Sequence, residues 1–134
     1  MGFSTSIQNQ FVDQWTLKTA FSAHAAVYVG LSSTTPTAAG SNVTEPSTGA
    51  YARVNVPASS MAASASGSAS STADVTFPTA TADWASAANL TYMVFYSAVT
   101  SGTFIGFAAL TAAKPVLNAD TAKISSGTLT VSVS

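Results

Sequence analysis

The chain has 134 residues with five acidic side chains, four basic ones and no cysteine, which fits one near-neutral domain over residues 1–134. Four scattered cations give no field to steer nucleic acid, and no apolar stretch reaches the roughly 20 residues that a membrane helix needs. Without cysteine, neither a disulfide framework nor a thiolate zinc site can form. Monomeric proteins usually stay soluble and unassociated because many charged side chains are spread over their surfaces. This chain has few charged side chains, so we expect it to associate with itself or with partners.

Residues 4–21 form the one predicted helix. Ser4 offers an N-cap hydroxyl, and Ile7, Phe11 and Trp15 recur at a spacing of four, so one helix face is apolar. That face must lie against something. It packs on this protein's own sheet, or Phe11 and Trp15 dock on a neighbouring subunit or a larger assembly, since aromatic anchors are typical of interface centres. Ile7, Phe11 and Trp15 are therefore the candidate interface residues.

The first half of the remaining chain predicts two strands and two loops. Residues 26–31 are rich in β-branched and aromatic residues and predict a central strand. Turn-forming residues fill positions 32–50, which indicates a long surface loop. Residues 51–56 alternate with a period of two, which predicts a strand with one buried aliphatic face. Residues 58–73 are nearly all Ser and Ala, so we expect a loop or an irregular edge.

The second half predicts short strands separated by turns. A strand at 74–77 is expected to stop at Pro78, and Trp84 in the next connector is expected to cap the core. Residues 90–99 and 103–110 flank a Ser-Gly turn and predict a β-hairpin whose first strand is covered on both faces.

A last pair of strands, 122–124 and 128–133, flanks Ser125–Gly127, with Leu129, Val131 and Val133 facing the core. About seven or eight short strands, one terminal helix and no βαβ alternation predict a mainly β fold. We expect an antiparallel β-sandwich or jelly-roll-like domain, with the helix at 4–21 and the sandwich at 25–134.

No catalytic constellation is present in the sequence. His24 is the sole histidine, too few for the usual metal sites, and we expect it to be a hydrogen-bonded structural residue. No Gly-x-Ser-x-Gly elbow occurs, and the carboxylates are spread, which suits surface solvation and turn capping. We therefore expect no enzymatic activity and no catalytic, cofactor-binding or metal-binding residues. An enzyme acting on polysaccharide through Asp83 and Asp120 is the remotest alternative.

Several sequence blocks in a fixed order carry a family resemblance. They are Val-Tyr-Val-Gly-Leu-Ser-Ser-Thr-Thr-Pro at 27–36, Glu-Pro-Ser-Thr-Gly-Ala-Tyr-Ala-Arg-Val at 45–54, Ala-Asp-Val-Thr-Phe-Pro at 73–78, Ala-Thr-Ala-Asp-Trp at 80–84, and the closing blocks at 102–110 and 127–131. With these blocks the chain resembles small tailed-bacteriophage virion proteins, commonly labelled tail fibre proteins, whose relatives include head decoration or cement proteins. The resemblance implies a structural part of the virion.

The compact length favours one kind of virion part. No internal repeat or heptad pattern supplies a fibre shaft, so we expect a capsid decoration or cement protein on the capsid surface. In this interpretation a cyclic homo-oligomer, a trimer because capsid lattices offer threefold sites, clamps the major capsid protein through apolar contacts. The helix face and the loop at 32–50 are the candidate contacts. The alternative is a tail-associated fibre or receptor-binding knob, with tail proteins as partners and the loops 34–50 or 58–73 as receptor contacts.

Overall fold

The computed structural model describes residues 1–132 and shows a mainly β chain with antiparallel strand pairing. Within those residues the elements are β1 (Gly2–Phe3), α1 (Thr5–Trp15), β2 (Tyr28–Ser32), β3 (Val54–Asn55), the 3-10 helix η1 (Ala58–Ser60), β4 (Ser68–Ser70), β5 (Val75–Thr79), the 3-10 helix η2 (Trp84–Ala87), β6 (Leu90–Tyr96), β7 (Phe104–Lys114), β8 (Thr121–Ile124) and β9 (Thr130–Ser132). The predicted fold class, mainly β with one N-terminal α-helix, is confirmed.

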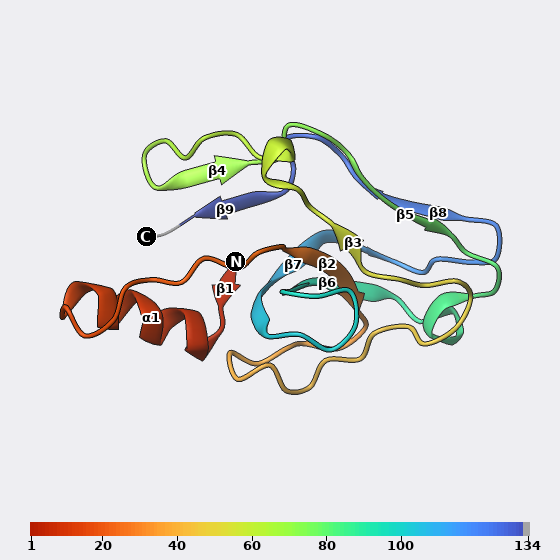
Figure 1. Cartoon of the computed structure of the whole chain (residues 1–134). Helices are drawn as coiled ribbons and strands as arrows, with labels where there is room; N and C mark the ends of the chain where they lie inside the picture. The colour runs from red at the N-terminus through yellow and green to blue at the C-terminus, as the bar shows by residue number, and fades with distance from the viewer. Residues whose placement is uncertain (133–134) are drawn as a thin grey trace.

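A five-stranded sheet in the order β1-β7-β6-β2-β3 forms one layer (Figure 1). The predicted hairpin is present as β6 and β7, and the predicted central strand is β2, which lies between β6 and β3. Register pairs Val29 with Phe95 and Leu31 with Met93, so these four buried side chains share the inner face of the sheet. The core of the sandwich therefore lies on the inner face of β2 and β6.

A bent two-stranded ribbon forms the second layer (Figure 1). Its first strand runs through β4 and β5, and its second runs antiparallel through β8 and β9, because β5 pairs with β8 and β4 pairs with β9. The expected pairing of 122–124 with 128–133 is wrong. Their connection is tied to the other strand instead: the Ser126 N–H donates to Asp74 (2.7 Å) and the Gly127 N–H to the Ser71 carbonyl (2.7 Å).

The same ribbon corrects two further predictions. Residues 58–73, expected to be a loop or irregular edge, contain η1 and β4, and β4 forms because β9 supplies its backbone partners. Pro78 does not end its strand, since β5 continues to Thr79. The register between Thr76 and Thr79 is irregular, and such a bulge accommodates a residue that has no N–H to donate. Of the predicted core face, Leu129 is buried and Val131 half-buried, while Val133 lies outside the described residues.

Trp84 was expected to cap the core, but it lies in the middle of the core. Its side chain is fully buried, its indole N–H donates to the Gly49 carbonyl (2.8 Å), and its ring packs edge-on against Tyr51 and Phe77. Burial of a whole indole with its one polar atom satisfied is among the largest single contributions to a core of this size. Trp84 therefore joins the loop before β3 to the ribbon.

The helix is shorter than the predicted 4–21. Ser4 is the N-cap as expected and its hydroxyl accepts from the Ile7 N–H, but α1 ends at Trp15. Leu17 adopts the left-handed conformation (φ 57°), its N–H donates to Gln14 O, and the Lys18 N–H donates to Asp13 O. This is the Schellman ending of a helix, with leucine at the position where glycine is usual. The chain reverses there.

The predicted strand at 51–56 is reduced to β3, and the long loop before it is confirmed. Residues 33–53 contain no helix or strand. The hydroxyl of the fully buried Ser32 accepts from the Thr34 N–H (3.2 Å) and the Thr44 N–H (3.1 Å), which folds the loop back on itself. The Tyr51 N–H donates to the Thr48 carbonyl (3.4 Å) within the loop, and pairing with β2 begins only at Val54.

The turn after Trp84 yields a test of local strain. Ala85, Ser86 and Ala87 all have left-handed backbone (φ 50°, 55° and 61°), which costs an L-residue about 1–2 kcal/mol each. We expect Ser86→Gly to raise the free energy of unfolding by about 0.5–1 kcal/mol and the unfolding temperature by about 3 °C in a thermal melt. Ser47→Gly is the control: Ser47 is also exposed but has no left-handed φ, so glycine there gives no gain. Equal melting shifts for the two variants would contradict the prediction.

Candidate assembly surface

The structure separates the three candidate interface residues by burial. Ile7 is 3% exposed and belongs to the core. Phe11 is half-buried between Phe3, at 5.8 Å between ring centroids, and Phe21, on which it stacks at 5.3 Å. Trp15 is 87% exposed. Ile7 and Phe11 thus attach α1 to its own chain, and only Trp15 is available to a partner.

Trp15 belongs to an apolar cluster at the C-terminal end of α1. Val12 is 61% exposed and Leu17 is 90% exposed, and we call Val12, Trp15 and Leu17 the helix tip. Sequence reasoning missed Leu17, because the helix was expected to continue past it. Figure 1 shows α1 projecting from the body, so the helix tip lies at the end of an arm.

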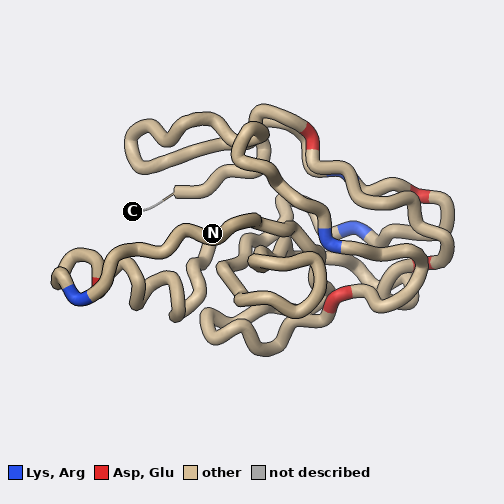
Figure 2. Tube along the Cα trace, in the orientation of Figure 1, with Lys and Arg blue, Asp and Glu red and all other residues tan. Residues whose placement is uncertain are grey.

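A cavity lies at the base of that arm. Its volume is about 840 Å³, and its lining includes Phe3, just before α1, and Val131 of β9. We call it the fork cavity because α1 and the β4–β9 end of the ribbon project on the same side of the body (Figure 1). Its walls come from the N-terminal segment, the chain before β2, η1 with its flanks, the inner sheet face and β9, represented by Phe3, Val27, Met61, Phe95 and Leu129. None of the side chains that line it is acidic or basic except that of His24, and Figure 2 shows no charged side chain on the β4–β9 arm.

His24 corrects one prediction. It was expected to be hydrogen-bonded, yet its Nε2 atom is buried without a hydrogen-bond partner within residues 1–132. The cavity wall around it consists largely of alanine and other apolar side chains, which offer no donor or acceptor. The histidine is structural in position, but its polar atom is not satisfied in the isolated chain.

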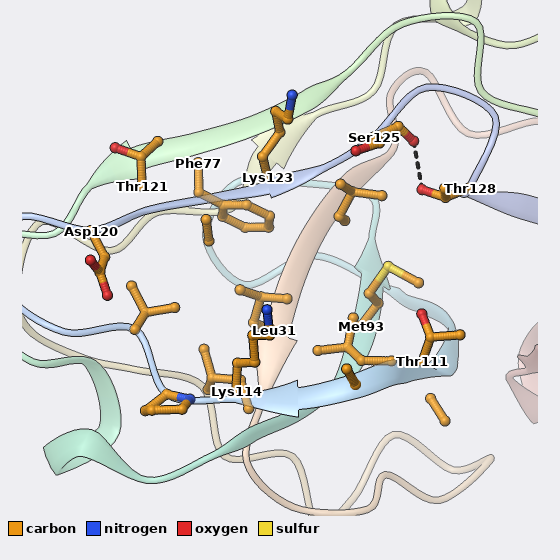
Figure 3. A pocket seen from close by; sticks show the side chains of 18 residues that line it. Leu31, Phe77, Met93, Thr111, Lys114, Asp120, Thr121, Lys123, Ser125 and Thr128 are labelled. Atoms are coloured by element: carbon orange, nitrogen blue, oxygen red, sulfur yellow. Dashed lines mark hydrogen bonds between the residues drawn. The ribbon is translucent and has the colours of Figure 1, made fainter.

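A second cavity opens at the opposite edge of the sandwich, between β7 and β8 (Figure 3). This layer cleft has a volume of about 670 Å³, and its apolar part is formed by core side chains, among them Leu31, Phe77 and Met93. Lys114, Asp120 and Lys123 also line it, together with three threonines and Ser125. Unlike the fork cavity, the layer cleft is therefore amphipathic.

The strongest electrostatic cluster is internal. Arg53 binds Glu45 through Nε (3.1 Å to both carboxylate oxygens) and through a second nitrogen, with side-chain exposures of 11% and 16%. The guanidinium carbon lies 3.4 Å from the ring centroid of Tyr96, a cation–π contact, and another nitrogen donates to the Ala98 carbonyl (3.2 Å). Arg53 thus ties the long loop to the β6–β7 hairpin.

Tyr51 completes this cluster. Its hydroxyl donates to Glu45 and accepts from the Leu31 N–H (2.8 Å). Burial, followed by the neighbouring Glu45 carboxylate, holds the pKa of Tyr51 well above its usual range, so the phenol stays protonated. A Cβ on Gly30 would lie 2.7 Å from the Tyr51 oxygen and closer still to Glu45, so only glycine leaves room for this carboxylate on the sheet. Sequence patterning gave no sign of the cluster.

Three other carboxylates act as turn caps, as expected. Asp83 accepts from the Asn118 N–H (2.8 Å), Asp120 from the Leu117 N–H (3.0 Å) and Asp74 from the Ser126 N–H. That backbone donor, and then Lys123, lower the pKa of Asp74. Within residues 1–132, no group of three or more histidine, aspartate or glutamate side chains is placed to hold a metal ion. None of the helices described there combines the length and the apolar run that crossing a bilayer requires.

The sequence profile of the podophage GP4 fiber I protein gp80 family matches residues 2–132, nearly the whole chain. The chain belongs to this family. No curated protein sequence matches it significantly. The resemblance to small tailed-phage virion proteins is thereby confirmed, and membership of the fiber I family makes the chain a fibre-type structural protein of a bacteriophage virion.

For this fiber I family member, the internal cluster and the surface ion pair make a matched test of stability. Removing Arg53 leaves Glu45 buried without its partner, so Arg53→Ala should lower the free energy of unfolding by about 3 kcal/mol. Lys123→Ala breaks the exposed pair with Asp74, at 50% and 43% exposure, and should change the stability far less than Arg53→Ala does. Urea unfolding measures both. A loss for Arg53→Ala no larger than for Lys123→Ala would show that the cluster does not clamp the loop.

Proposed function

We propose that this chain is a non-enzymatic fibre subunit of a tailed-phage virion, associated with the tail, and that it assembles through the helix tip. The observation that carries the proposal is the exposure of Val12, Trp15 and Leu17 in a member of a fibre protein family. Exposed apolar side chains gathered at one end of a helix are typical of protein interaction surfaces. Aromatic side chains are frequent at the centres of such surfaces.

The energy available at the helix tip suits this role. Complete burial of one large apolar side chain contributes about 1.5–3 kcal/mol, so the helix tip offers roughly 5 kcal/mol of association free energy before ordering costs. Charge offers little by comparison, because the chain has nine charged side chains and the Glu45–Arg53 and Asp74–Lys123 pairs occupy four of them. Apolar contact is therefore the main means by which this subunit can bind a neighbour.

The compact length of the chain favoured capsid decoration in the sequence analysis. The description of the family favours the fibre alternative instead. A fibre does not require a shaft within each chain, because one-domain subunits can stack through repeated contacts. A homotrimer is part of the proposal, as are tail proteins as partners. In a capsid decoration protein the same helix tip would contact the major capsid protein instead.

The location of the protein on the particle decides between these functions. We expect gold-labelled antibodies against the chain to bind at the tail of intact virions, on its fibres. Label spread over the capsid faces would contradict the tail assignment and support capsid decoration.

Two substitutions in one helix separate assembly from folding. Trp15→Ala removes an exposed side chain, so the unfolding temperature should change by less than about 2 °C while self-association measured by light scattering is lost. Ile7→Ala empties a core position and should cost about 2–4 kcal/mol of stability. If Trp15→Ala unfolds the chain as Ile7→Ala does, or leaves association intact, the helix tip is not the assembly surface.

A further inference from the structure

We propose that the partner of the helix tip is the fork cavity of a second copy of this chain. This inference rests on the proposed function and identifies the receiving surface, which neither the family nor the sequence pattern assigns. It is supported by the geometry of the two surfaces, by their chemistry, by the area that they can bury and by the backbone conformation of Leu17.

Geometry makes the contact intermolecular. Met1 and Phe3, which lead into α1, line the fork cavity, whereas the helix tip lies at the far end of α1 (Figure 1). Ile7 and Phe11 hold α1 against its own chain, and the Phe21 N–H donates to the Gln14 side chain (2.7 Å), which fixes the reversal after the helix. The helix tip therefore cannot fold back into its own cavity, and a neighbouring copy can present its helix tip there.

Chemistry distinguishes the fork cavity from the layer cleft. The fork cavity has apolar walls without an acidic or basic side chain apart from His24, whereas Lys114, Asp120 and Lys123 line the layer cleft (Figure 3). An indole and two aliphatic side chains lose no charge solvation in the fork cavity, and its volume lies within the range that accommodates drug-sized groups. Asp13 and Lys18, which flank the helix tip in sequence, suit a solvated rim.

One helix tip in one fork cavity is a small contact, so each copy must use both of its surfaces to be held firmly. An aromatic side chain buries about 150–250 Å², so the helix tip brings roughly 400 Å² to one contact. Standard interfaces bury about 800 Å² per partner. One contact therefore has about half the standard area, and a copy buries roughly 800 Å² in total only by inserting its helix tip into one neighbour and receiving the helix tip of another. Such a contact joins unlike surfaces, which generates closed rings, a trimer among them, or continuous rows.

The backbone at Leu17 supports the assignment. Its left-handed conformation (φ 57°) favours glycine, yet a leucine occupies it and exposes 90% of its surface. The isolated chain gains almost nothing from this side chain. Docking of Leu17 into an apolar cavity provides the contact that offsets the unfavourable conformation.

A charge at the cavity wall tests the contact. Ala62 is exposed and lines the fork cavity, so Ala62→Asp leaves the free chain folded but places an unpaired carboxylate in the docked interface. Ala39→Asp is the matched control, because Ala39 is exposed, lines neither the fork cavity nor the layer cleft, and receives the same charge. In sedimentation experiments we expect Ala62→Asp to weaken self-association at least 100-fold, as Trp15→Ala does, while Ala39→Asp changes it less than threefold.

Leu17→Gly gives a second readout with opposite signs. Glycine relieves the left-handed backbone, so the unfolding temperature of the dilute, dissociated chain should rise. Loss of the leucine side chain should weaken self-association at least tenfold in the same sedimentation experiment. A purely structural Leu17 would change stability alone.

Three results would overturn the proposal. One is a wild-type chain that stays monomeric, and another is Ala62→Asp that associates as well as Ala39→Asp. The last is Leu17→Gly that associates as strongly as the wild-type chain. If the protein is found on the tail but Ala62→Asp still associates, the proposed function stands and the fork cavity is not the receiving surface. If the protein is absent from the tail, the proposed function fails whatever the variants do.

Discussion

One bent ribbon of two strands covers the inner face of a five-stranded sheet. The ribbon is narrower than the sheet, and the other features of the molecule depend on this difference in width. Trp84 closes the core where ribbon and sheet meet in the middle. Toward each edge the ribbon leaves core side chains uncovered, which produces the layer cleft beside β7 and β8 and the fork cavity beside β9. A wider second layer would remove both cavities. The narrow ribbon therefore leaves a core that another chain can complete.

Most of the few charged side chains serve the interior or the turns. Arg53, Glu45 and Tyr96 hold the long loop on the β6–β7 hairpin, and Asp74, Asp83 and Asp120 cap backbone N–H groups. Figure 2 shows no charged side chain on the β4–β9 arm, and apart from His24 no acidic or basic side chain lines the fork cavity, so little side-chain charge keeps copies apart there. The few charged side chains thus gather where they bind other groups of the same chain, and the remaining side of the surface is apolar.

Sequence reasoning succeeded where local pattern and tertiary structure agree, and failed where a distant partner decides. The β6–β7 hairpin, the Ser4 N-cap and the long loop follow from turn residues and periodicity. No local signal indicates that β9 pairs with β4, that Arg53 reaches Tyr96, or that Gly30 leaves space for Glu45. The helix tip was half predicted: spacing four identified Trp15, but periodicity cannot show that Ile7 and Phe11 face inward, nor that Leu17 ends the helix.

The attachment of the helix arm bears on the strength of any contact that it makes. An isolated helix of 11 residues is marginal in water, and a long side chain at a frayed end would lose considerable entropy on binding. In this chain Ile7 anchors the first turn, Phe11 stacks on Phe21, and the Schellman bonds of Leu17 and Lys18 close the last turn. The backbone that presents the helix tip is thus ordered before a partner arrives. Preorganisation of this kind leaves more of the burial energy available for association, which allows a small apolar contact to hold a fibre subunit in place.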